Sequence, residues 1–453
     1  MTKRLEKAHG AVALKAEEVK VKVAEVHEEN PFFHPVRRML MACLGAVALA
    51  SDEVENFVHM LIERGEIAEQ DGRKLLEEVT ERTQKRMKPA EKKSSATPKF
   101  RPYADDVESV PSTEQDDIRK VVESIEQILQ TGRERRGKAL PDVHAKGHGC
   151  AKGKFKVLPN LPEELAQGLF RHPNTYDAVV RFSNGSGQLN PDSKPDARGM
   201  AVKVIGVEGE KLLADEKNAQ TQDFVMVDHP VFIVGTVEHY LRVEQVLAAA
   251  GDSQLVQALG LAFTGDWDVP RHIAELLRAG QIATHSAANL VSNTYYSMAP
   301  IRFGQYVAKY RMEPVQDGVH ALKPSLTKPG PEEDALRLLL EETLRQQEVQ
   351  FNFQVQLRTS EHTMPVEDAT VEWPESESPY RTVATFRILK QDIAPLREAG
   401  NDLSFTVWHA LADHRPLGGI NRVRRAAYRT SSVWRHQKAG KERKEPDSVK
   451  DIA

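Results

Sequence analysis

The chain has 453 residues, of which 40% are hydrophobic and 28% charged, and its formal net charge at pH 7 is −4. This composition is typical of a folded protein with roughly two or three domains. The small net charge excludes a general attraction to nucleic acid or to an anionic membrane, so we expect neither as a partner.

The apolar runs and the cysteines predict neither secretion nor a membrane span. The longest apolar run covers residues 39–50, which is shorter than the roughly 20 residues that cross a bilayer. Cys43 and Cys150 form neither a disulfide framework nor a CxxC zinc motif. We therefore expect a reduced, cytoplasmic protein without a transmembrane segment.

Changes in composition divide the chain into four segments. A stretch rich in Lys, Pro, Ser and Thr separates a helical region from the main domain and is predicted to be flexible. The predicted division is a helical module at residues 1–83, a linker at 84–118, the main domain at 119–437 and a charged tail at 438–453.

Residues 36–83 are predicted to form a helical hairpin with a turn near Gly65. This stretch weakly resembles the phasins, helical proteins that associate with polyester storage granules or with partner proteins. The resemblance implies that the module tethers the main domain to a granule, an apolar surface or a partner. A generic helical hairpin for self-association is the alternative.

The main domain is predicted to be an antiparallel eight-stranded β-barrel. A helix over residues 114–130 leads into it, and a helical insertion at roughly 237–293 interrupts its strands. The predicted strands are KFKVLP, YDAVVRFS, GMAVKVIG, DFVMVDH, GQYVAKYRM, VQFNFQVQLR, ATVEW and RTVATFRIL. With C-terminal helices that end near Trp434, the expected fold class is α+β.

Four short motifs carry the chemistry of this domain. They are VHAKGHG at residues 143–149, VRFSNGSG at 180–187, PDARGMAVKV at 195–204 and RVRRAAYRTSSVWRH at 422–436. Their order and spacing over roughly residues 120–437 resemble the haem catalase superfamily, and the last motif is closest to its small, catalase-related peroxidase branch. The resemblance implies haem b as the cofactor and a peroxide as the substrate.

The last motif contains the predicted iron ligand. Arg424 and Tyr428 are four residues apart and share one face of a helix, where the guanidinium stabilises a phenolate. Tyrosinate is a known axial ligand of haem iron. The resemblance assigns ligation to Tyr428, its activation to Arg424 and contact with a haem propionate to Arg435.

A second Arg-xxx-Tyr pair, Arg302 and Tyr306, lies in IRFGQYVAKYRM, which is typical of a strand. Along a strand, four residues span on the order of 13 Å, which is too far for direct contact. We therefore do not expect Tyr306 to be the ligand.

The first two motifs contain the predicted distal residues. A neutral imidazole at His144 can take a proton from peroxide and return it. Arg181 and Ser183 share one face of a strand, and the resemblance implies that Arg181 binds a propionate and that Ser183 orients His144. His148 forms a His-xxx-His pair with His144, but the adjacent glycines argue against a helix and thus against a metal site.

One departure from the catalase pattern concerns the distal asparagine. The matching stretch here reads QTQDF, so Gln220 or Gln222 is predicted to replace that amide. A longer side chain puts efficient disproportionation of hydrogen peroxide in doubt. Val143 precedes the histidine as in true catalases, which favours a peroxidase over an isomerase.

These features predict a haem peroxidase or catalase-like oxidoreductase that acts on hydrogen peroxide or organic hydroperoxides with an unidentified small-molecule reductant. One alternative is a haem-dependent isomerase of lipid hydroperoxides. The other is a non-catalytic haem-binding or granule-associated interaction protein.

Overall fold

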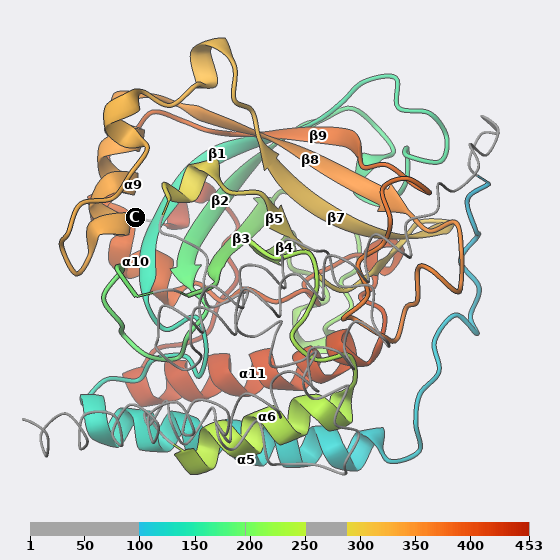
Figure 1. Ribbon diagram of the computed structural model, residues 1–453, viewed down its shortest axis with the longest axis horizontal. Helices are drawn as coiled ribbons and strands as arrows, with labels where there is room; N and C mark the ends of the chain where they lie inside the picture. The colour runs from blue at the N-terminus through green and yellow to red at the C-terminus, as the bar shows by residue number, and fades with distance from the viewer. Residues whose placement is uncertain (1–98, 195, 251–287, 453) are drawn as a thin grey trace, which may run out of the picture. The chain divides into compact units, whose positions relative to one another are not determined.

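The computed structural model describes residues 99–194, 196–250 and 288–452, which are coloured in Figure 1. The phasin-like stretch at residues 36–83 lies outside these residues, so the expectation for it stays a prediction. The same holds for residues 84–98 of the expected linker and for most of the expected helical insertion.

One antiparallel sheet closes on itself to form the barrel (Figure 1). The strand order is β5-β4-β3-β2-β1-β9-β8-β7, and pairing of β5 with β7 closes the ring of eight, while β6 extends β7 as a hairpin. The strands are β1 (Gly147–Val157), β2 (Thr175–Asn184), β3 (Arg198–Ile205), β4 (Thr221–Val227), β5 (Tyr295–Tyr296), β6 (Ile301–Phe303), β7 (Tyr306–Pro314), β8 (Val349–Leu357) and β9 (Arg381–Ile388). The predicted eight-stranded antiparallel barrel is confirmed.

Two of the predicted strands are wrong in detail. Residues 369–373 form no strand, because Trp373 packs with Met364 and Val366 in a cluster of its own instead of pairing with the sheet. The eighth strand is instead the two-residue β5. The stretch with Arg302 is not one strand either, because a turn at Gly304, with φ of 60°, separates β6 from β7.

Aromatic side chains fill the inside of the barrel. Phe155, Phe170, Phe224 and Phe353 are almost fully buried there, and the rings of Phe224 and Phe353 have centroids 4.6 Å apart. Such ring pairs contribute about 0.5–1.5 kcal/mol each beyond their burial. Because the inside is a packed core, a ligand site has to lie on the outer wall.

Three long helices pack together on one side of the barrel (Figure 1). They are α5 (Glu114–Arg136), α6 (Val237–Ala250) and α11 (Gly419–Ala439), and their apolar faces form one buried cluster. The shorter α9 (Ala335–Gln346) and α10 (Arg397–Asp402) lie beside β1. The predicted helix at residues 114–130 is confirmed and continues to Arg136, where Gly137 ends it in a left-handed conformation.

Residues 99–113, which belong to the expected linker, run along the barrel. The backbone N–H of Tyr103 donates to the carbonyl of Gln305 at 2.7 Å. The Glu108 carboxylate accepts hydrogen bonds from the Gly418 backbone at 2.8 Å and from Arg422 at 2.6 Å. These contacts connect this segment to the first turn of α11.

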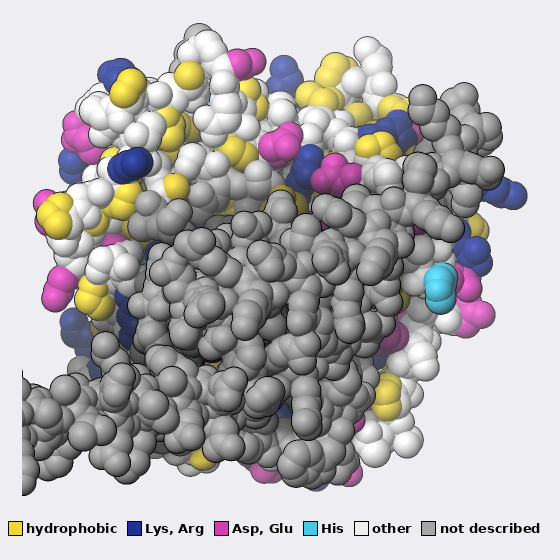
Figure 2. Space-filling view, viewed as in Figure 1, with side chains coloured by type: hydrophobic (Ala, Val, Ile, Leu, Met, Phe, Trp, Pro, Cys, Tyr) yellow, Lys and Arg dark blue, Asp and Glu magenta, His cyan; other side chains and the backbone are white. Residues whose placement is uncertain are grey.

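The surface of the described residues carries charges of both signs. Lys and Arg side chains are interspersed with Asp and Glu on the face that Figure 2 shows. No helix of this part of the chain has the length and apolar character that crossing a membrane requires.

Candidate functional site

The alternation of side chains along three neighbouring strands builds the outer wall of the barrel. In the register of β2, β3 and β4, Arg181 lies opposite Ala201, which lies opposite Val225. In the next row, Ser183 lies opposite Gly199. The residues between them point into the barrel core. One face of the wall therefore presents a guanidinium and a hydroxyl above small and apolar side chains.

This wall and α11 line a cavity that is open to solvent, with about 700 Å³ of empty space when the solvent at its mouth is included. The loop before β1 and residues 401–405 complete its lining. The cavity brings together five residues that the sequence predicts for the site, namely His144, Arg181, Ser183, Tyr428 and Arg435. These residues come from three separate parts of the chain, namely the loop before β1, β2 and α11.

Tyr428 lies on α11 with its hydroxyl held by a guanidinium. Nη2 of Arg424 is 2.6 Å from the Tyr428 oxygen, and Nε is 3.1 Å from it. Arg424 is 4% exposed, and its third contact is with the side-chain oxygen of Asn421 at 3.1 Å. Among the described residues, no carboxylate forms an ion pair with Arg424. Its charge is therefore directed at the phenol oxygen and stabilises a negative charge there.

The backbone around His144 is strained and firmly held. His144 has φ of 55°, in the left-handed region that residues other than glycine rarely adopt. Its N–H donates to the carbonyl of Gly185 at 2.9 Å, and its carbonyl accepts from Arg181 at 3.0 Å. The ring atom Nδ1 is 3.1 Å from the Ser183 hydroxyl. These contacts orient the imidazole into the cavity.

His144 is neutral over most of the pH range. Burial, together with the positive charge of Arg181, lowers the pKa of His144 to about 4. At neutral pH the imidazole therefore has a free nitrogen that can accept a proton.

Gly199 makes room for this histidine. A Cβ atom at Gly199 would lie 2.7 Å from Nδ1 of His144 and 2.8 Å from the Ser183 hydroxyl oxygen. A methyl group there is incompatible with the hydrogen bond between the two side chains. We expect Gly199→Ala to displace the ring toward solvent and to move the pKa of His144 from about 4 toward its usual value. An NMR titration of the imidazole measures this shift.

Gly206→Ala provides the control for that substitution. Gly206 has φ of 86°, and no atom lies within 4 Å of a Cβ built on it. Alanine there costs about 1–2 kcal/mol in backbone strain but leaves the cavity unchanged. An unaltered pKa of His144 in Gly199→Ala would contradict the proposed packing.

Two guanidinium groups line the cavity, and neither is paired with a carboxylate of the described residues. Arg181 donates to the carbonyl of His144, and Arg435 donates to the carbonyls of Asn401 and Leu403. Within the described ranges, neither forms an ion pair with an acidic side chain. Burial and then the neighbouring charge of Arg435 lower the pKa of Arg181 to about 10. Half-buried cations that no carboxylate pairs with are costly, so this end of the cavity favours a ligand with negative groups.

The two glutamines that were expected to replace a distal amide are placed elsewhere. Gln220 is exposed, and the side-chain oxygen of Gln222 accepts a hydrogen bond from the backbone of Leu411 at 3.0 Å. Neither lines the cavity. Gln222 is on the face of β4 whose side chains point into the barrel. The β4 side chain that points outward to the cavity is that of Val225. The prediction that either amide lies near His144 is therefore wrong.

Two further expectations concern neighbouring residues. His148 lies in β1 and not in a helix, which agrees with the expectation from the adjacent glycines, and its Nε2 is 2.6 Å from the side-chain oxygen of buried Asn184. Tyr306 packs its ring edge-on against Phe100, and Arg302 lies over the ring of Tyr103. None of these side chains belongs to the cavity.

Sequence reasoning missed several polar residues that line the cavity. Asp142 precedes the histidine motif, Asn401 belongs to α10, and Ser431 and Ser432 lie on α11 after the tyrosine. The one usable signal was helical spacing, because Ser431 and Ser432 lie three and four residues beyond Tyr428. Nothing local in the sequence predicts the place of Asn401.

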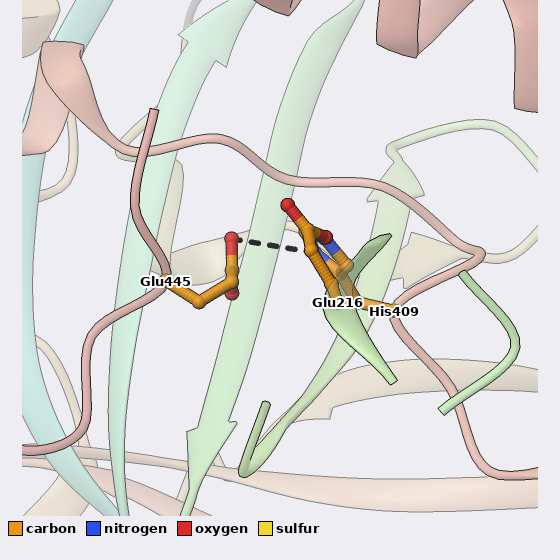
Figure 3. A group of neighbouring side chains, drawn as sticks. All are labelled: Glu216, His409 and Glu445. Atoms are coloured by element: carbon orange, nitrogen blue, oxygen red, sulfur yellow. Dashed lines mark hydrogen bonds and ion pairs between the residues drawn. The ribbon is translucent and has the colours of Figure 1, made fainter. Parts of the chain in front are cut away.

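A second polar cluster consists of Glu216, His409 and Glu445, and it lies apart from the cavity (Figure 3). One possible ligand atom from each residue lies within 4.8 Å of the others. The spacing alone fits a metal ion. Glu445 comes from the C-terminal segment that was expected to be a charged tail.

Positive side chains already neutralise this cluster. Lys203 lies 2.7 Å from Asp223 and 2.6 Å from Glu445, and Arg443 lies 2.5 Å from Glu216. Burial and Lys203 favour neutral His409, but the contacts with Asp223 and Glu216 outweigh them and raise the pKa of His409. Three cations thus face three carboxylates, and a metal ion would add uncompensated charge. We interpret the cluster as an ion-pair network that holds the C-terminal segment on the barrel.

Comparison with known proteins adds little sequence evidence. No family model and no curated protein matches the chain. Among solved structures, catalase A from Saccharomyces cerevisiae is 16% identical and has a TM-score of 0.47, with 68% of this chain and 62% of that chain covered. A fungal catalase is 17% identical with a TM-score of 0.47 and coverage of 68% and 61%. A bacterial catalase is 15% identical with a TM-score of 0.43 and coverage of 68% and 59%.

The chain therefore spans about three fifths of the length of these structures. The functional argument depends on the side chains of the cavity.

Proposed function

We propose that this protein is a haem-dependent oxidoreductase that reduces hydrogen peroxide or an organic hydroperoxide at the expense of a small organic donor. The observation that carries the proposal is the joint presence, in one cavity, of the Arg424–Tyr428 pair and the His144–Ser183 pair. A phenol activated by a guanidinium suits ferric iron, and a neutral imidazole suits a peroxide proton.

The donor set of the cavity fits haem b. Tyr428 would ligate the iron, and Arg181 and Arg435 would bind the propionates, which supply the negative charge that these two guanidiniums lack among the described residues. When bound, haem supplies an iron centre that accepts electrons from the donor and promotes cleavage of the peroxide O–O bond.

The protein moves the proton. The free nitrogen of His144 takes the proton from the peroxide hydroxyl and returns it to the leaving oxygen. The bond to Ser183 and the strained backbone keep the ring in place during both transfers. Because the pKa of His144 is about 4, the imidazole is ready to accept a proton at any pH above roughly 5.

The wall around His144 favours peroxidase action over disproportionation. Val225 is the β4 residue whose side chain points outward from the barrel at this wall. It cannot donate a hydrogen bond to a bound peroxide. Val143, which also lines the cavity, offers no hydroxyl, which favours a peroxidase over an isomerase. A donor molecule, not a second hydrogen peroxide, is therefore the proposed reductant.

Addition of haem to the purified protein tests this proposal. We expect one haem per chain, the absorption spectrum of high-spin ferric haem with a tyrosinate ligand, and peroxide-dependent oxidation of a generic phenolic donor. We expect slow oxygen release from hydrogen peroxide alone. A protein that stays colourless after addition of haem would overturn the proposal and favour an interaction protein.

A further inference from the structure

Two buried carboxyl groups lie where the cavity meets a second pocket. This pocket has about 940 Å³ of empty space and lies between α5, α6 and residues 185–188. Asp142, which is 9% exposed, lines both the pocket and the cavity of His144. Glu244 of α6, which is 2% exposed, lines the pocket. The two carboxyl groups thus connect the two spaces.

The surroundings of Glu244 leave part of its side chain without a partner. Its Oε2 atom is buried and has no hydrogen-bond partner within the described residues, while Tyr240, one helical turn earlier, interacts with the carboxyl group. Burial, followed by the negative charge of Asp142, raises the pKa of Glu244 to about 8. At neutral pH, Glu244 therefore carries a proton.

Asp142, which lies in the loop before β1, lines the cavity of His144. Burial raises its pKa, and hydrogen bonding by Ser431 of α11, which also lines the cavity, partly offsets that rise. The other ionisable groups around the pair are Arg135 and Arg136 of α5, Tyr240 of α6, Tyr428 of α11 and His144. Burial raises the pKa of both carboxyl groups, and the negative charge of Asp142 adds to that rise for Glu244, so the pair as a whole holds one proton at neutral pH.

We propose that Asp142 and Glu244 form a proton-transfer pair that delivers protons from the second pocket to the cavity of His144. The delivery role depends on the proposed function, because reduction of a peroxide consumes protons as well as electrons. A donor that gives up only an electron leaves those protons to the protein.

The transfer balances without any redox change in the pair. The Glu244 carboxyl passes its proton across the second pocket, which both side chains line, to the Asp142 carboxylate, and Asp142 releases it to the peroxide oxygen that His144 does not protonate. Solvent in the second pocket then returns a proton to Glu244. Only O–H bonds form and break, and the electrons come from the donor.

Infrared spectroscopy of the full-length protein without haem tests the shared proton. We expect a carboxylic acid C=O band at pH 7 that is lost as the pH rises through about 8, following Glu244. Glu244→Gln removes the band. Glu238→Gln, on an exposed residue of the same helix, keeps it.

Asp142→Asn is a second variant that tests the same proton if Glu244→Gln does not fold. Without the Asp142 charge, the band should titrate at a lower pH than in the wild type. A wild-type protein without such a band, or a band that both variants leave unchanged, overturns the shared proton.

Thermal unfolding gives a second signature of Glu244. Its folded pKa of about 8 exceeds the ordinary value of 4.5, so between these two pH values the folded state holds a proton that the unfolded state has lost. The contribution of Glu244 to the stability of the wild type should therefore fall as the pH rises from 4.5 to 8. In Glu244→Gln this fall should be absent, and in Glu238→Gln it should be unchanged.

The haem-loaded protein tests delivery. At pH 7 we expect Glu244→Gln to slow peroxide reduction several-fold and to increase its solvent deuterium isotope effect, while Glu238→Gln changes neither. If the infrared band is present but haem does not bind, the proposed function fails and the proton-sharing pair remains. If haem binds but the rate and isotope effect of Glu244→Gln equal those of the wild type, proton delivery by the pair is wrong.

Discussion

Tyr428→Phe is expected to abolish the tyrosinate spectrum and to weaken haem binding by more than about 100-fold. The variant removes the one oxygen that Arg424 contacts at 2.6 Å, so neither a charged ligand nor its activation remains. Loss of a group that merely orients a metal ligand already costs roughly 10–100-fold in affinity, so loss of the ligand itself should cost more. Haem titration followed by visible absorption measures both effects.

Tyr306→Phe is the matched control for this substitution. Tyr306 also follows an arginine by four residues, but its ring packs against Phe100 and lies outside the cavity. We expect its spectrum and affinity to equal those of the wild type. A Tyr428→Phe protein with the wild-type spectrum would show that another residue ligates the iron.

His144→Asn is expected to slow peroxide reduction by on the order of 10²–10⁴-fold, the contribution of a positioned acid–base group. Asparagine is chosen because it tolerates the left-handed backbone, with φ of 55°, better than alanine does. Haem affinity and the tyrosinate spectrum should change little, because His144 lies on the barrel side of the cavity, whereas Tyr428 lies on α11. Single-turnover reaction with peroxide measures the loss.

The pH dependence distinguishes this loss from a structural one. The wild-type rate should stay level from neutral pH down to about 5 and fall as the pH approaches 4, because His144 then becomes protonated. His144→Asn should show no such fall. His172→Asn, on an exposed histidine, is the control with wild-type behaviour. If the rate of His144→Asn fell at acid pH in the same way as the wild-type rate, another group would have to carry out the proton transfer.

Much of the candidate site was predictable because its features are local. Arg424 and Tyr428 meet because helical residues four apart lie on one face, and their contact is as expected. Arg181 and Ser183 point outward together because side chains alternate along a strand. The barrel followed from the same alternation, repeated over successive short segments.

The predictions were wrong where the local sequence pattern does not determine where a segment lies in the fold. The stretch that ends at Trp373 alternates like a strand, but it packs against the outside of the barrel. Gln222 matches the motif position of a distal amide, yet the parity of β4 turns it away from His144 and brings Val225 to the cavity. A motif match does not reveal the parity of a strand, because a shift of one residue reverses its faces.

We could predict the barrel class, the tyrosine–arginine pair and the histidine motif from the sequence alone, since each depends on residues close together in the chain. The tertiary structure was needed to show that Gly199 makes room for His144 and that Asp142 and Glu244 line one pocket. These relations join segments far apart in sequence, and they arise from strand register and from the packing of α5, α6 and α11 on one another. No periodicity along the chain encodes such distances, because they are set when the sheet closes and the helices pack on it.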